Sequence, residues 1–162
     1  MTLAQTYAPS LELLRAARRN VHRICAAFSV EELNRIPAGL NNNLIWNAGH
    51  LIATLEGLTY GLSGLPQPSG PDFIARYRKG TAPHGDADAA ECARILDDLL
   101  PSVDRFAADL DRLDWSNYRE YATSFGVTLH DLGDAITFNN MHETLHLGAV
   151  LTQRTLLRGR VH

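Results

Sequence analysis

Two histidines with metal-chelating spacing lie near the end of the chain, in the segment 141–146 (Met-His-Glu-Thr-Leu-His). His146 lies four positions after His142, so on a helix both project from one face, one turn apart. The same face carries Ala135, Phe138, Asn139, Leu145, Ala149, Gln153 and Leu156. The two imidazoles are therefore expected at the core, where an unpaired polar group costs about 1–3 kcal/mol. One metal ion would satisfy a nitrogen of each ring; hydrogen bonds to buried polar groups are the alternative.

The third ligand that such a site needs is best supplied by His50. It lies in the middle of a helical segment whose only charged residue between positions 41 and 64 is Glu56. Small residues such as Ala53 and Gly57 flank it and leave space for an ion, although a hydrogen-bonded core histidine is again the alternative. We predict that the remaining histidines face solvent: His22, His84, His130 and His162.

Three imidazoles would leave at least one coordination position open for water or a substrate. Nitrogen ligands suit zinc, nickel, iron or copper and disfavour calcium and magnesium. We therefore expect one divalent transition metal, with zinc as the default, held by His50, His142 and His146.

Two other motifs overlap these histidines. His142-Glu-Thr-Leu-His146 also matches the signature of zinc metalloproteases, in which Glu143 would be the general base. The extended form of that motif requires a glycine and a third histidine where Ala149 and Thr152 stand, and no sheet is predicted to bind a peptide. Glu143-x-x-His146 is half of a di-iron motif, but the chain lacks the second half. Both interpretations are disfavoured.

Four segments with helical periodicity position these residues: 9–28, 43–62, 88–113 and 128–158. Pro101 is expected to kink or split the third, and Gly159 to end the fourth. Capping boxes are predicted at Ser29 with Glu32 and at Thr128 with Asp131. A connection rich in glycine and proline spans 63–85, with one helical turn expected at 72–78. The pattern predicts an all-α four-helix bundle forming one domain over residues 1–162.

Composition excludes several classes of protein. The net charge is -3 and no block of basic residues exists, so nucleic acid is not an expected partner. The basic segments 15–19 and 76–79 are interpreted as solvated helix faces. Cys25 and Cys92 are expected to be buried free thiols in a reducing compartment. Neither a signal peptide nor a long apolar run is present in the sequence, which favours a cytoplasmic location without membrane contact.

The second helical segment predicts an assembly. A helix with Glu56 as its sole charge should be covered on most sides, by the core on one side and a second subunit on the other. We therefore expect a homodimer.

The sequence resembles the DinB/YfiT-like superfamily of metal-binding four-helix bundles. The resemblance rests on Asn43-Leu-Ile-Trp-Asn-Ala-Gly-His50-Leu51, on Phe125-Gly-Val-Thr128, and on His142-x-x-x-His146-x-Gly148 followed by Arg154 and Gly159. It implies an up-down-down-up bundle with a long crossover loop, a metal site at His50, His142 and His146, and frequent homodimers. It assigns Glu143 no fixed role.

Some proteins of that superfamily are S-transferases or isomerases that use low-molecular-weight thiols. By analogy, the first hypothesis is a metal-dependent enzyme that transfers a thiol to a small molecule. The connections 63–85 and 115–125 would form the apolar walls of its substrate slot. A non-catalytic metal-binding or ligand-binding stress protein is the second hypothesis, and a structural bundle with vestigial histidines is the third.

Overall fold

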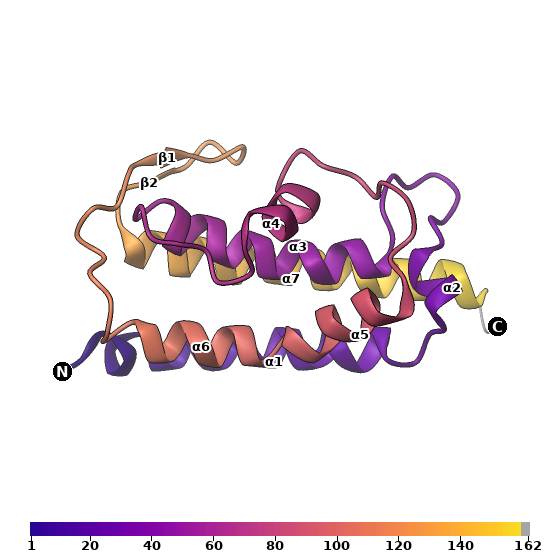
Figure 1. Cartoon of the computed structure of the whole chain (residues 1–162), viewed down its shortest axis with the longest axis horizontal. Helices are drawn as coiled ribbons and strands as arrows, with labels where there is room; N and C mark the ends of the chain where they lie inside the picture. The colour runs from indigo at the N-terminus through magenta and orange to yellow at the C-terminus, as the bar shows by residue number, and fades with distance from the viewer. Residues whose placement is uncertain (160–162) are drawn as a thin grey trace.

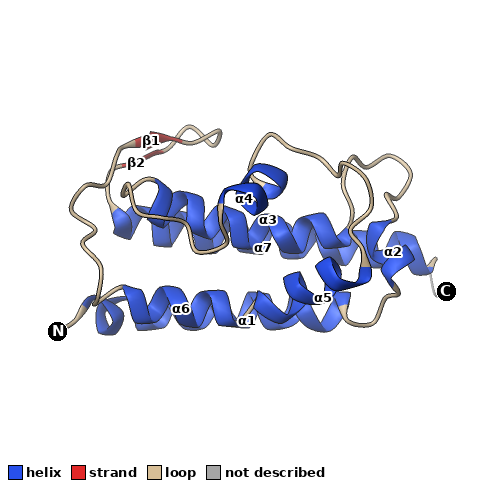
Figure 2. Cartoon of the chain, in the orientation of Figure 1, coloured by secondary structure: helices blue, strands red, loops and turns tan. Residues whose placement is uncertain are grey.

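Helices account for most of the chain in a computed structural model that describes residues 1–159 (Figures 1 and 2). In chain order the elements are α1 (Leu3–Cys25), α2 (Val30–Asn34), α3 (Leu44–Glu56), the π-helical turn η1 (Gly57–Gly61), α4 (Pro71–Tyr77), α5 (Ala89–Asp98), α6 (Pro101–Asp109), β1 (Tyr121–Ala122), β2 (Thr128–Leu129) and α7 (Leu132–Arg158). The prediction made for His162 lies outside the described residues. The mostly helical composition expected from the periodicity is confirmed.

The long helices run side by side. α1 packs against α7, α6 and α3, and α3 packs against α7 and α5. In Figure 1, α3 and α7 form an upper layer, α1, α5 and α6 form a lower one, and α4 and the β1–β2 hairpin lie above α3 and α7. The α4 segment and the hairpin therefore cover the upper side of the layer formed by α3 and α7.

The first long helix begins earlier than the predicted Pro9. The Thr2 side chain accepts a hydrogen bond from the Gln5 backbone N–H, and the Gln5 side chain accepts one from the Thr2 N–H. This capping box starts α1 at Leu3. The predicted start at residue 9 was therefore too late: Pro9 lies inside the helix, where its missing N–H removes only one hydrogen bond.

Two other predicted boundaries are confirmed. Ser29 and Glu32 form the expected capping box at the start of α2. Pro101 divides the third helical segment into α5 and α6, as its missing N–H requires.

The start of the last helix differs from the prediction, because Thr128 belongs to a strand. Thr128 pairs with Ala122 in the short antiparallel hairpin, whose turn places Gly126 at φ 75°. Asp131 caps α7 instead, its side chain accepting from the Asp134 N–H. The helix ends as predicted, at Gly159 with φ 71°.

The nearly uncharged helix α3 is covered by its own chain. All its residues except Thr54 are buried, and the Glu56 side chain is only 2% exposed. Ser69, in the connection that follows η1, donates to the Glu56 carboxylate from its N–H (2.9 Å) and its hydroxyl (2.8 Å). A second subunit is therefore not needed to bury α3, and the homodimer stays a prediction that rests on the resemblance alone.

The basic segment 15–19 is not wholly solvated, because Arg18 is completely buried. Its guanidinium pairs with the Glu143 carboxylate (Nη2–Oε1 2.7 Å) and donates to the Leu51 carbonyl (2.8 Å). It also donates to the Ser102 hydroxyl (2.6 Å) and the Leu99 carbonyl (3.1 Å). One side chain thus links α1 to α3, to α7 and to the junction of α5 with α6.

Cys25 and Cys92 are both buried and free, as predicted. Among residues 1–159, no helix is long and apolar enough to cross a membrane.

Candidate metal centre

The structure brings together the three histidines that the sequence analysis selected. His50 comes from α3, and His142 and His146 come from α7; one ring nitrogen of each lies within 4.8 Å of those of the other two. Of the remaining histidines, His84 and His130 are exposed and His22 is half-buried.

Two of the three rings are held in orientations that leave a nitrogen free. His50 Nδ1–H donates to the Tyr77 carbonyl (2.6 Å), and His146 Nδ1–H donates to Asn47 Oδ1 (2.7 Å). The tautomers follow from the acceptors, because a carbonyl oxygen only accepts. In both rings Nε2 therefore carries the lone pair, the arrangement common among metal-binding histidines. In His50 this lone pair also lies 3.3 Å from the Thr54 hydroxyl, which can donate to it when no metal is bound.

His142 is the ring whose polar atoms are least satisfied. Its Nδ1 is buried and has no hydrogen-bond partner among the described residues, and its Nε2 lies 3.3 Å from His50 Nε2. An ion bonded to two nitrogens at about 2.0–2.1 Å in tetrahedral geometry would hold them about 3.3–3.4 Å apart. The separation observed between the two rings fits a shared transition-metal ion.

Burial keeps these imidazoles in the form that binds metal. Desolvation, followed by the neighbouring His146 and His50, lowers the pKa of His142 to about 2. Desolvation, followed by His50, lowers the pKa of His146 to about 4. Desolvation also lowers the pKa of His50, against the opposing effect of the Tyr77 carbonyl. All three rings are therefore neutral at pH 7, where protons would not compete with a metal ion for their lone pairs.

Residues around the triad fix its geometry. The Trp46 ring stacks on His50 with centroids 4.6 Å apart and an interplanar angle of 11°. The Asn47 amide is oriented by its Nδ2, which donates to the Asn43 carbonyl (2.8 Å). Trp46 could have been found from the sequence, since it lies four residues before His50 on the same helix. The role of the Tyr77 carbonyl could not have been predicted from the sequence, because every residue type has a backbone carbonyl.

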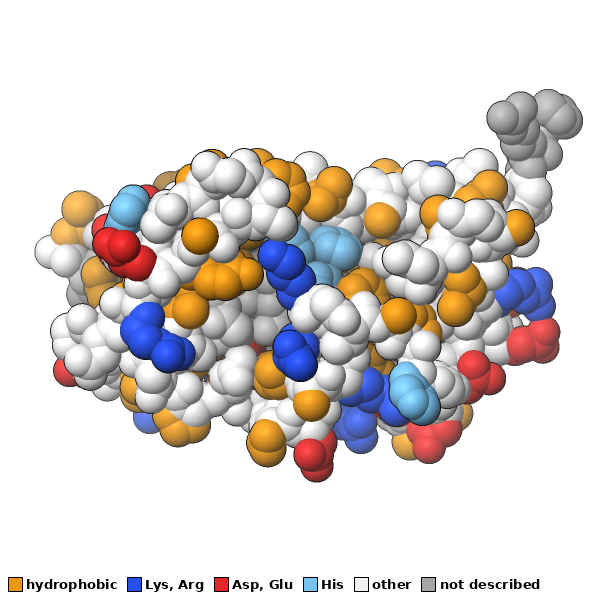
Figure 3. Space-filling view, turned by 90° about the horizontal axis from the view of Figure 1, so that it is seen from above, with side chains coloured by type: hydrophobic (Ala, Val, Ile, Leu, Met, Phe, Trp, Pro, Cys, Tyr) orange, Lys and Arg blue, Asp and Glu red, His pale blue; other side chains and the backbone are white. Residues whose placement is uncertain are grey.

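A cavity of about 510 Å³ opens above the triad. Figure 3 shows histidine side chains in a hollow of the upper face, beside lysine and arginine side chains. Its wall includes Ile74, Arg78 and Lys79 from one connection and Tyr121, Thr123, Ser124 and Phe125 from the other. Segments 63–85 and 115–125 both contribute to the wall, as predicted, but the side chains that they contribute are not all apolar, because they include two cations and two hydroxyl groups from Thr123 and Ser124.

Two residues assigned to the core face of the last helix are instead half-exposed. Leu145 is 54% exposed and lines the mouth of the cavity, and Leu156 is 51% exposed. The predicted stripe was too wide. At Leu145 the reason is that this side of α7 borders the cavity and not another helix.

Glu143 faces the interior and not the cavity. It is completely buried, and Arg18 Nε lies 3.1 and 3.3 Å from its two carboxylate oxygens. Burial raises the pKa of the Glu143 carboxyl, and the Arg18 guanidinium opposes this effect. A carboxylate so engaged is not positioned to take a proton from water above the histidines, which argues against the metalloprotease interpretation.

Gly49 permits the close contact that brings the Tyr77 carbonyl to His50. A Cβ at position 49 would lie 2.6 Å from the Tyr77 ring, which is buried and tied to Glu91 by a 2.7 Å hydrogen bond. We expect Gly49→Ala to lower the free energy of unfolding by about 1–3 kcal/mol, measured by urea denaturation. The matched control is Gly148→Ala on α7, where a Cβ meets nothing within 4 Å; it should stabilise by up to about 1 kcal/mol. Equal effects of the two substitutions would contradict the contact.

Comparison with known proteins gives a family and a fold. A family model described as the DinB superfamily matches residues 13–150. The structure is similar to a crystal structure described as the conserved protein of locus from Enterococcus faecalis, with a TM-score of 0.65, 19% sequence identity and 99% of each chain covered. At that identity the likeness concerns the fold alone. No curated protein sequence matches the chain.

Proposed function

The chain belongs to the DinB superfamily, and from that premise we propose that it binds one divalent transition metal through His50, His142 and His146 and acts on a small molecule beside it. The observation that carries the proposal is the convergence of the three rings, two with Nδ1 already committed to an oxygen and Nε2 left free. Zinc is the default ion, since imidazole ligands suit it and three of them leave a position open.

We further propose that the reaction is the transfer of a low-molecular-weight thiol to an electrophile. The thiol would lose its proton to solvent, its sulfur would bond to the electrophilic carbon, and the group displaced from that carbon would leave with the bonding electron pair. A divalent ion supplies positive charge that favours the thiolate over the thiol. The chain supplies the rest: the Tyr77 carbonyl and Asn47 orient the rings, and Leu58, Phe125 and Phe138 line the space where an electrophile would lie. A cavity of about 510 Å³ suits a small molecule better than a macromolecule.

A non-catalytic binding protein is the second candidate, because the same cavity can hold a ligand without changing it. Spectroscopy of the cobalt-substituted protein tests the thiol binding that the transferase proposal requires. We expect a physiological thiol at millimolar concentration to produce a sulfur-to-cobalt charge-transfer band. The band should weaken as the pH falls, because protons compete for the thiolate. The control is the corresponding alcohol, which should give no band.

The outcome against the transferase is a cobalt spectrum that no physiological thiol changes. In that case the binding protein becomes the better proposal, since metal binding would stand without thiol chemistry. The family also leads us to propose that α1, α3, the α5–α6 pair and α7 form an up-down-down-up bundle, and that two chains associate as a homodimer.

A further inference from the structure

The charged side chains that line the cavity are of one sign. Arg78 and Lys79 are the charged residues of the wall, and no aspartate or glutamate lines it within residues 1–159. A cavity with cations at its wall and no compensating carboxylate concentrates anions.

Arg78 and Lys79 are free to bind a ligand, unlike the arginine that precedes them. Arg76 pairs with Glu91 at 3.1 Å. Neither Arg78 nor Lys79 forms an ion pair with any residue in the range 1–159. Lys79 Nζ lies 3.5 Å from the Tyr121 hydroxyl and 6.0 Å from the centre of its ring, so the ammonium is directed toward the hairpin across the cavity.

The two cations are also placed by the segment that orients the metal site. They directly follow Tyr77, whose carbonyl accepts from His50 Nδ1. The Arg78 N–H donates to the Ile74 carbonyl (2.9 Å), and the Thr81 hydroxyl donates to the Arg78 carbonyl (2.8 Å). The backbone at Arg78 is therefore hydrogen-bonded on both sides, next to the residue whose carbonyl contacts His50.

The rest of the wall is largely apolar. It includes Leu58, Leu62, Ile74, Phe125, Phe138 and Leu145. A fully polar ligand would leave these side chains without a partner, whereas a ligand with an apolar body would cover them.

From these observations we propose that the cavity selects organic carboxylates with an apolar body, whose carboxylate is held by Arg78 and Lys79. The arginine fork suits the two oxygens of a carboxylate, and the lysine ammonium adds a second charge-assisted hydrogen bond. This inference deepens the proposed function by naming the class of its substrate, and it rests on that proposal for the reaction.

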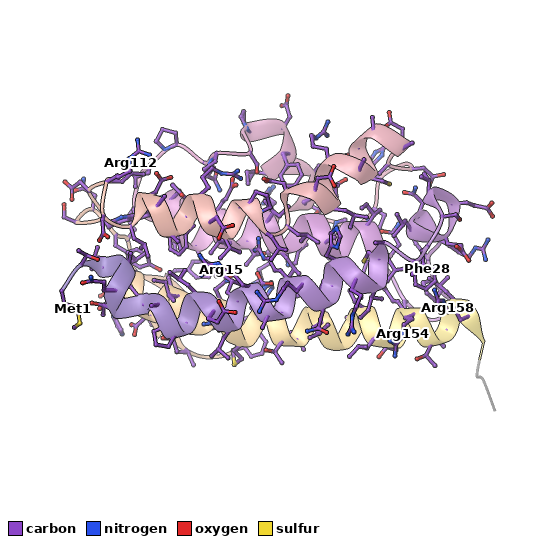
Figure 4. All side chains as sticks on the ribbon, turned by 90° about the horizontal axis from the view of Figure 1, so that it is seen from below. Met1, Arg15, Phe28, Arg112, Arg154 and Arg158 are labelled. Carbon is purple, nitrogen blue, oxygen red and sulfur yellow. The ribbon has the colours of Figure 1, made fainter. Side chains whose placement is uncertain are left out.

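The test uses 3-phenylpropionate and its neutral analogue 3-phenylpropanol, titrated by calorimetry into the metal-free and the zinc-loaded protein. We expect the carboxylate to bind at least about tenfold more tightly than the alcohol in both forms. In the double variant Arg78→Gln/Lys79→Gln the difference should fall to about twofold or less. The matched control is Arg94→Gln/Arg154→Gln, which removes the same charge from two exposed arginines outside this cavity and should keep the full preference. Figure 4 shows one of them, Arg154, on α7.

Three results would overturn the proposal: equal binding of the two compounds, a preference that survives in the Arg78→Gln/Lys79→Gln variant, or a preference seen only with zinc bound. The last would mean that the ion and not the two cations recognises the carboxylate. Failure of the proposed function is a separate result, because a protein that binds no zinc still reports the preference in its metal-free form. Zinc content of the double variant, expected at the wild-type value, shows that the triad is intact.

Discussion

Replacing His142 with alanine is expected to weaken zinc binding by at least about 100-fold. Mutating a residue that only hydrogen-bonds to a metal ligand already weakens binding by up to about 100-fold, and the loss of a ligand should cost at least as much. His142 closes the triad, with Nε2 3.3 Å from His50 Nε2. The remaining pair, His50 and His146, would hold an ion by two nitrogens only. Dialysed protein measured by elemental analysis should contain about one zinc per chain in the wild type and far less in the variant.

The control for this experiment is His22→Ala, a half-buried histidine on α1 outside the triad, which should keep its zinc. The triple variant at His50, His142 and His146 should contain no zinc above background. Full metal content in that triple variant would show that the ligands are elsewhere and would end the proposed function.

The second large effect is expected at the buried ion pair. Arg18→Met should lower the free energy of unfolding by about 3–5 kcal/mol, because it leaves the Glu143 carboxylate buried without a partner. The double variant Arg18→Met/Glu143→Leu should recover most of this loss, since it removes both charges and fills the same space with apolar atoms. Urea denaturation of the metal-free protein measures both variants without a contribution from the ion.

Arg15→Met on the same helix is the matched control. Arg15 also forms an ion pair, with Asp104 at 2.8 Å, but its side chain is 27% exposed and that of its partner 64%. Figure 4 shows Arg15 on the lower face of the molecule. Its loss should cost at most about 1 kcal/mol. If Arg18→Met were no more harmful than Arg15→Met, the pair would not stabilise the core.

The Arg18–Glu143 ion pair lies next to the candidate metal centre. Glu143 directly follows His142 in α7, and the Leu51 carbonyl that accepts from Arg18 directly follows His50 in α3. One guanidinium therefore ties together the two helices that carry the three histidines, at the level of the candidate site. Zinc content of Arg18→Met/Glu143→Leu reports whether apolar packing alone maintains that spacing.

Local sequence patterns were enough to predict the elements that carry the site. Apolar periodicity located the long helices, and the missing N–H of Pro101 divided α5 from α6. The spacing of His142 and His146 placed both on one face of α7, because residues four apart are neighbours on any α-helix. These features depend on backbone geometry within a few residues, which residue types determine directly. The same reasoning failed at Thr128, where pairing with Ala122 in the hairpin prevailed over a local capping pattern.

Arg18 shows what local patterns could not decide. Its spacing from Leu14 and Val21 put it on the buried stripe of α1, but a charged residue is placed there only if a partner from another helix neutralises it. The partner, Glu143, is 125 residues away in sequence.

Local patterns also could not decide how the histidine rings are oriented or what forms the wall of the cavity. The sequence alone was sufficient to select His50, His142 and His146, because their types and their positions within helices carry that information. Which nitrogen carries the lone pair in His50 and in His146 depends on the Tyr77 carbonyl and on Asn47, and the position of the cations at the wall depends on where α4 lies. These are contacts between segments far apart in the chain, and only the packing of the helices brings them together.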